Sequence, residues 1–103
     1  MIYKKTPKAD EDILSIYAYT LEQFGEEQAI TYFRSLEGCF EFLCDHPRAA
    51  KQREEFNPPV RIHHHKKHFI LYSVEDEYLL IVRVLHERRE LKRYLDLLSG
   101  DNE

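Results

Sequence analysis

The amino-acid sequence predicts one α+β domain, in which an N-terminal strand and a helical hairpin precede a run of strands. Apolar side chains recur at helical spacing between Ala9 and Leu43, and from Val60 onward the composition changes to that of β-strands. The length of 103 residues is close to the commonest size of a single domain, and 43% of the residues are hydrophobic. These residues suffice for one compact core and leave no room for a second domain.

The first helix has a recognisable start and end. Residues 2–6 predict a short strand that stops at Thr6-Pro7, where Thr6 is a good N-cap and Pro7 a good first helical residue. Asp10, Glu11 and Asp12 then place negative charge near the positive end of the helix dipole. We expect this helix to end at Gly25, because glycine tolerates the left-handed backbone of a C-terminal stop.

A second helix is predicted from Glu26-Glu27 to Asp45-His46-Pro47, since the residue before a proline avoids helical geometry. Because only Gly25 separates the two helices, they are expected to form an antiparallel hairpin. Cys39 and Cys44 lie five residues apart on this helix, a spacing that does not place them face to face. We therefore expect no disulfide and no metal site there, and interpret both cysteines as core residues.

The second half of the chain predicts a sheet. Residues 45–59 hold three of the four prolines and are expected to form a long loop. Strands are predicted at 60–65, 68–74 and 78–86, as an antiparallel meander that completes a four-stranded sheet with the N-terminal strand. A short C-terminal helix or tail follows. The turn at Lys66-Lys67 lacks the Gly or Asn that a tight hairpin prefers, so its register is left open.

The strand at 78–86 is apolar on both faces. If its side chains alternate strictly, one face carries Tyr78, Leu80, Val82 and Val84, and the opposite face carries Leu79, Ile81 and Leu85. A helical hairpin covers only one face of a sheet. The other face must be covered either by the tail, through Leu91, Leu95 and Leu98, or by a partner.

A histidine cluster surrounds the predicted turn at residues 66–67. On a strand, His63 and His65 share a face, His64 lies opposite, and His68 follows across the turn. Imidazoles at i and i+2 are able to hold a metal, but a third ligand and its supporting residues are not identifiable. We therefore favour a solvated, pH-sensitive edge strand and predict no metal site.

The segment from Arg83 to Arg89 concentrates positive charge where the last strand ends. His86 is suited to proton transfer, and the arginines are suited to a phosphate or an oxyanion. The alternative is a solvated tail in which Arg88, Arg89, Lys92 and Arg93 pair with neighbouring acids, and taken alone the segment favours this alternative. The sequence has no nucleophile elbow, phosphate loop, HExxH pair or zinc-spaced cysteine set, and no cofactor is expected.

The overall charge and the N-terminus narrow the class of protein. The formal net charge is −4, whereas a protein whose main task is to hold nucleic-acid phosphates usually has a large positive surplus. No apolar run approaches the roughly 18 residues needed to cross a bilayer. The first seven residues lack the apolar segment of a signal peptide, so a cytoplasmic location is expected.

Several segments, in their order and spacing, resemble the ParE/RelE superfamily of bacterial toxin–antitoxin toxins, and most closely its ParE, or plasmid-stabilisation, branch. They are the first-helix pattern at 9–20, Phe24-Gly25-Glu26-Glu27-Gln28-Ala29, Asp45-His46-Pro47-Arg48, Phe69-Ile70-Leu71-Tyr72, and Ile81 to Arg89 with its His-x-Arg-Arg ending. The family often has glycine where Ala49-Ala50 and Lys66-Lys67 stand here. These departures affect the loop geometry rather than the fold.

This resemblance implies a RelE/ParE-like helical hairpin packed on a sheet, and a ParD-like antitoxin, of ribbon-helix-helix type, that wraps and blocks the chain in a hetero-oligomeric complex. ParE-branch members are known for inhibiting DNA gyrase, whereas RelE-like relatives cleave mRNA on the ribosome. A sequence pI near 5.9 favours the ParE-type function, because a ribosome-dependent nuclease needs a strongly basic surface. A third possibility is an inactive copy that only binds the antitoxin.

The resemblance also assigns expected roles to residues of this sequence. Contacts with the target are expected from His86, Arg88, Arg89, Lys92 and Arg93. Contacts with the antitoxin are expected from Ile16, Tyr17, Phe33, Phe40, Leu79 and Ile81. Were the chain a nuclease, its catalytic groups would be Arg83, His86, Arg88 and Tyr94.

Overall fold

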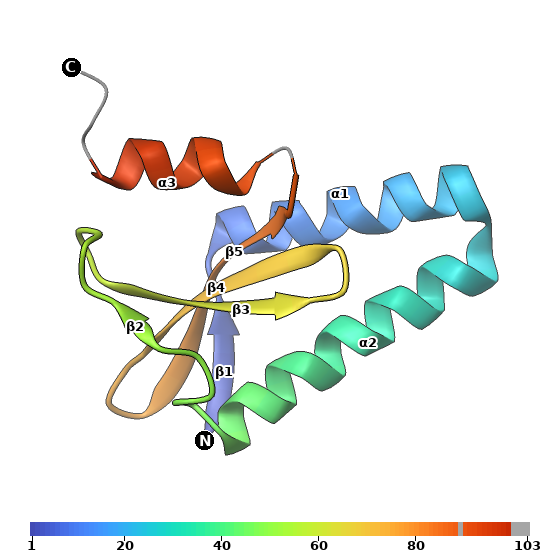
Figure 1. Ribbon diagram of the computed structural model, residues 1–103. Coiled ribbons are helices and arrows are strands. Elements are labelled where there is room, and N and C mark those ends of the chain that lie inside the picture. The colour runs from blue at the N-terminus through green and yellow to red at the C-terminus, as the bar shows by residue number, and fades with distance from the viewer. Residues whose placement is uncertain (89, 100–103) are drawn as a thin grey trace.

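The computed structural model describes residues 1–88 and 90–99 (Figure 1). The elements in chain order are β1 (Ile2–Lys5), α1 (Pro7–Phe24), α2 (Glu26–Asp45), β2 (Gln52–Arg53), β3 (Val60–His65), β4 (His68–Val74), β5 (Tyr78–His86) and α3 (Leu91–Ser99). The strands form one sheet in the order β1-β5-β4-β3-β2, with β1 parallel to β5 and the other neighbours antiparallel. The α+β fold, the hairpin and the meander are therefore confirmed.

The strand count differs from the prediction. The sheet has five strands rather than four, because the expected loop at 45–59 contains β2, which pairs with Val60 and Arg61 of β3. The turn between β3 and β4 is tight, since His65 pairs directly with His68. Lys66 supplies the left-handed backbone of this turn, with φ at 55°, in place of a glycine. No helix among the described residues is both long enough and apolar enough to span a membrane.

Short-range signals set the helix ends as predicted. Thr6 caps α1, because its Oγ1 accepts a hydrogen bond from the backbone N–H of Ala9 at 3.0 Å. Gly25, with φ at 94°, ends α1 and is also the residue before α2. The two helices meet there and diverge along the sheet, so that they cover one of its faces (Figure 1).

A β-bulge in β5 overturns the predicted alternation of that strand. Leu71 of β4 pairs with Arg83, but the next residue, Tyr72, pairs with Ile81, so Val82 is an extra residue in β5. The extra residue reverses the faces beyond it. Val84 therefore joins Leu79 and Ile81 in the core beneath the hairpin, whereas Leu85 lies in the core on the opposite face. The predicted placement of Val84 and Leu85 was wrong.

The second face of the sheet is covered by the chain itself. Leu91, Tyr94 and Leu95 of α3 pack against Leu71 and Leu85, together with Phe56 and Val60 from the preceding loop and β3. Of the two predicted covers, the tail is therefore the one found. The side chain of Leu98, which was expected to contribute, lies outside the described residues.

Candidate functional site

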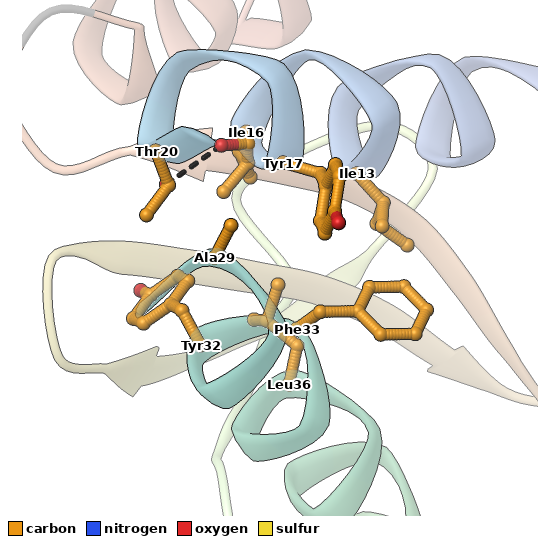
Figure 2. A pocket seen from close by; sticks show the side chains of 8 residues that line it. All are labelled: Ile13, Ile16, Tyr17, Thr20, Ala29, Tyr32, Phe33 and Leu36. Carbon is orange, nitrogen blue, oxygen red and sulfur yellow. Dashed lines mark hydrogen bonds between the residues drawn. The ribbon is translucent and has the colours of Figure 1, made fainter. Parts of the chain in front are cut away.

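The contact between α1 and α2 is a closed apolar seam. Figure 2 shows the eight side chains that line it, which are Ile13, Ile16, Tyr17, Thr20, Ala29, Tyr32, Phe33 and Leu36. The rings of Tyr17 and Phe33 meet edge to face, with their centroids 6.3 Å apart. The space left at the centre is too small for a water molecule. The seam therefore holds the hairpin together and is not itself a ligand site.

An open groove of about 360 Å³ lies beside this seam. It is lined by Lys5, Asp10, Ile13, Leu14, Tyr17 and Phe33. Its floor is apolar, and its rim carries an ion pair between Lys5 Nζ and Asp10 Oδ1 at 3.3 Å. Leu14, which lines this groove, is 69% exposed. An apolar floor with a charged rim suits a peptide segment laid along α1.

The structure divides the expected antitoxin contacts into two sets. Ile16, Tyr17 and Phe33 are partly buried at the seam, and Tyr17 and Phe33 also line the groove. In contrast, Phe40, Leu79 and Ile81 are core residues with exposed fractions of 2%, 0% and 0%. These three are corrected to core positions, because a docking partner has no access to them in this conformation. Leu14 was not predicted as a contact residue, because its exposure depends on which side of α1 packs against α2.

Arg83 is held inside the fold rather than offered to a target. Its Nε and Nη2 donate to the two carboxylate oxygens of Asp12, at 2.7 and 2.9 Å, and the same carboxylate accepts from the backbone N–H of Val84 at 3.0 Å. The hydrogen bond to Asp12 raises the pKa of the Arg83 guanidinium. The guanidinium also lies 5.3 Å from the centre of the Tyr94 ring. Arg83 therefore links α1, β5 and α3.

The basic residues that follow Arg83 and are described by the structure are partly or fully exposed. The backbone N–H of Arg88 donates to His86 Nδ1 at 3.1 Å. Nδ1 is therefore the acceptor nitrogen of the neutral imidazole, and this hydrogen bond already engages it. Arg88, Lys92 and Arg93 are exposed, and Lys92 lies 3.4 Å from Asp96. Arg89 lies outside the described residues. Of the predicted nuclease groups, Arg83 is already engaged by a carboxylate, and burial raises the pKa of Tyr94.

The histidines are less solvated than predicted. His63 and His65 share a face as expected, but that face meets α2, where His65 Nε2 lies 3.0 Å from Ser35 Oγ. His68 Nδ1 lies 2.6 Å from the Tyr32 hydroxyl. His64 alone fits a solvated edge, with a side chain that is 52% exposed. Within residues 1–88 and 90–99, no group of three or more metal-ligating side chains is arranged to hold an ion.

His68 should make the folded state sensitive to acid. Burial, reinforced by the nearby His86, lowers its pKa from 6.5 to about 4. The unfolded chain takes up this proton below about pH 6.5, and the folded chain only near pH 4, so stability falls as the pH drops between them. Because the ring is partly exposed and solvent screens its interactions, the expected loss is on the order of 1–2 kcal/mol by pH 4. Urea unfolding at several pH values should show it.

Two glutamine substitutions separate this effect from general acid unfolding. His68→Gln should reduce the pH-dependent difference between pH 6.5 and 4.5, with a remainder from His63 and His65, whose pKa values burial also lowers. His64→Gln, at an exposed position, should leave the difference in place. Equal pH slopes for the wild type and His68→Gln would show that His68 does not carry the dependence.

This chain is similar in sequence to known proteins over most of its length. The profile of the family described as "ParE toxin of type II toxin-antitoxin system, parDE" matches residues 3–91. Toxin ParE1 of Caulobacter vibrioides is 28% identical over 93 residues, which cover 90% of this chain and 96% of that protein. Toxin ParE1 of Mycobacterium tuberculosis strain H37Rv is 30% identical, with coverage of 90% and 96%. Toxin ParE of Escherichia coli is 30% identical, with coverage of 95% and 97%.

A solved structure has the same fold. It is described as a chromosomal ParDE TA system from P. aeruginosa, superimposes with a TM-score of 0.71 at 22% identity, and covers 84% of this chain and 95% of its own. The family profile spans most of the chain, and the relatives match over nearly their whole length. This chain belongs to the ParE toxin family of type II toxin–antitoxin systems.

Proposed function

We propose that this chain is held inactive by a cognate antitoxin and, when released, stops growth by inhibiting DNA gyrase. Membership of the ParE family supports the toxin role. The proposal that an antitoxin binds this chain is supported by the open apolar groove on α1, where Leu14 is 69% exposed. The gyrase part of the proposal is supported by the resemblance to the ParE branch, whose members are known for inhibiting DNA gyrase.

The groove fits an amphipathic segment of the antitoxin. Leu14, Tyr17 and Phe33 give it apolar anchor points, and the Lys5–Asp10 pair at the rim offers charges of both signs for register. A helix in such a groove gains most of its affinity from a few anchor side chains and its orientation from the rim. Ile16 lines the adjoining seam, together with Tyr17 and Phe33.

The target surface is proposed at the basic segment after β5. Arg88, Lys92 and Arg93 are exposed, and exposed charges that pair loosely add little to folding stability. They are free to serve recognition instead. A nuclease is less well supported, because Asp12 engages Arg83, one of the two arginines among the expected nuclease groups.

The test is a supercoiling assay with purified gyrase, relaxed plasmid and the full-length chain. The wild type should block supercoiling, and adding the antitoxin encoded beside it should restore the reaction. Arg88→Ala combined with Arg89→Ala should weaken inhibition while the fold stays intact, and His86→Ala should lose only part of it, since a contact residue is not an essential proton donor. Cleavage of messages in a translation extract, with supercoiling unaffected, would contradict the proposal.

A further inference from the structure

Two basic segments that are distant in sequence meet at one end of the sheet. Lys66 and Lys67 form the turn between β3 and β4, and Arg88 follows the end of β5. The backbone N–H of Glu87 donates to the carbonyl of Lys67 at 3.0 Å, so this hydrogen bond ties the two segments together. All three basic side chains are exposed. Below, "the basic end" means Lys66, Lys67 and Arg88.

The side chains of the basic end have few partners among the described residues, and one contact places Lys66 Nζ 5.8 Å from the centre of the Tyr32 ring. In the described part of the chain, none of its three side chains forms an ion pair. Two carboxylates lie near this end and keep their negative charge: Glu87, which lies 3.4 Å from His64 Nε2, and Glu90, which accepts from the backbone N–H of His86 at 2.9 Å. The three cations therefore outnumber these two carboxylates by one.

The opposite end of the sheet carries the opposite charge. The turn between β4 and β5 contains Glu75, Asp76 and Glu77, and Figure 1 shows it at the far end of β4 from the turn that holds Lys66 and Lys67. The seven residues of β4 separate the two turns by about 23 Å. The fold is therefore electrically polar along its strands. A net charge of −4 does not prevent this end from facing a polyanion, because the local field decides the approach.

The chemistry of this end fits nucleic-acid phosphates better than an acidic protein. Protein interfaces are anchored by buried aromatic or aliphatic side chains, whereas phosphate contacts need only cations and polar groups. Among the described residues, the exposed large apolar side chains all lie elsewhere, at Met1, Ile2, Leu14, Tyr19, Leu21, Phe24, Phe42, Val74 and Leu97. The basic end thus has cations without an apolar anchor.

We propose that the basic end is a docking surface for the phosphate backbone of duplex DNA. This deepens the proposed function, because DNA is what gyrase holds, and it adds the turn at residues 66–67 to the segment after β5. Binding would be independent of sequence, since Lys and Arg contacts to phosphates carry no base readout. It would also be weak and sensitive to salt, as expected for about three phosphate contacts.

The test measures binding of the full-length chain to a fluorescent 20-base-pair duplex by anisotropy, at 50 to 200 mM NaCl and without gyrase. The wild type should bind with a slope of log K against log salt near −2.7, from about 0.9 for each of three contacts. The triple variant Lys66→Gln, Lys67→Gln, Arg88→Gln should bind on the order of tenfold more weakly at 50 mM NaCl and lose most of this slope.

A second triple variant controls for total charge. Lys4→Gln, Arg48→Gln and Lys51→Gln remove the same number of charges from exposed positions outside the basic end, and should change DNA binding less than twofold. Equal weakening in both variants would overturn the proposal, as would no binding by the wild type. Tighter binding of poly-glutamate than of the duplex, at equal total charge, would also overturn it, in favour of an acidic protein partner.

The two proposals fail separately. The DNA-binding assay contains no gyrase, so a chain that inhibits gyrase but does not bind the duplex would refute only the docking surface. A chain that binds the duplex through the basic end without inhibiting gyrase would leave the docking surface standing and refute the gyrase target.

Discussion

Replacing Asp12 by alanine is expected to lower the free energy of unfolding by about 3–4 kcal/mol, because one carboxylate satisfies three donors at the centre of the fold. Its side chain is 11% exposed and that of Arg83 is 20% exposed, so removal leaves a largely buried guanidinium unpaired. The backbone N–H of Val84, next to the β-bulge, loses its acceptor at the same time. Urea unfolding at pH 7 measures the loss.

Asp10→Ala is the matched control for this prediction. Asp10 lies on the same helix and also contacts a cation, Lys5, but its side chain is 59% exposed. Its removal should cost less than about 0.5 kcal/mol, since exposed ion pairs contribute little. The loss of unfolding free energy for Asp12→Asn should lie between those for Asp12→Ala and Asp10→Ala, because the amide keeps one acceptor oxygen but not the charge. A loss below about 1 kcal/mol for Asp12→Ala would mean that Arg83 finds another partner or water.

The parts of the fold that depend on neighbours in sequence were predictable. Thr6-Pro7, Gly25 and Pro47 each act within one helical turn, and each ends or begins a helix where expected. The change to strand composition at Val60 also marks the start of β3. Signals of this kind need no knowledge of tertiary contacts.

The β-bulge at Val82 was not predictable, because the strand is apolar on both faces and either register buries a full set of side chains. Two hydrogen bonds hold the bulge, one from Thr6, the N-cap of α1, and one to Asp12 of α1. The Thr6 hydroxyl donates to the carbonyl of Val82 at 2.8 Å, and Asp12 accepts from the N–H of Val84 at 3.0 Å. Both partners are more than 70 residues away in sequence.

The roles of individual charged residues were the hardest to predict. Asp12 had a local explanation, since it lies near the start of α1, where the helix dipole favours negative charge, and this concealed its pairing with Arg83. Arg83 in turn looked like part of the basic segment that follows it. In the candidate site, Tyr17 and Phe33 could be named from helical spacing, but the exposure of Leu14 depends on how the two helices diverge.

Replacing Leu14 by glutamate is expected to weaken binding of the cognate antitoxin by roughly 30- to 100-fold, about 2–3 kcal/mol. Leu14 is 69% exposed in the free chain, so the charge costs little folding stability there. In the complex, the same charge would be buried in the groove beside Tyr17 and Phe33 without a partner. Calorimetric titration with the antitoxin encoded by the neighbouring gene measures the change.

Leu97→Glu provides the matched control, because Leu97 is 62% exposed on α3 and does not line the groove. It should change the affinity less than twofold. Thermal unfolding of both variants, compared with the wild type, reports whether the free chain remains folded. If Leu14→Glu binds as tightly as the wild type, the antitoxin does not use the groove on α1. Equal weakening by both substitutions would instead indicate a contact surface that extends over α3.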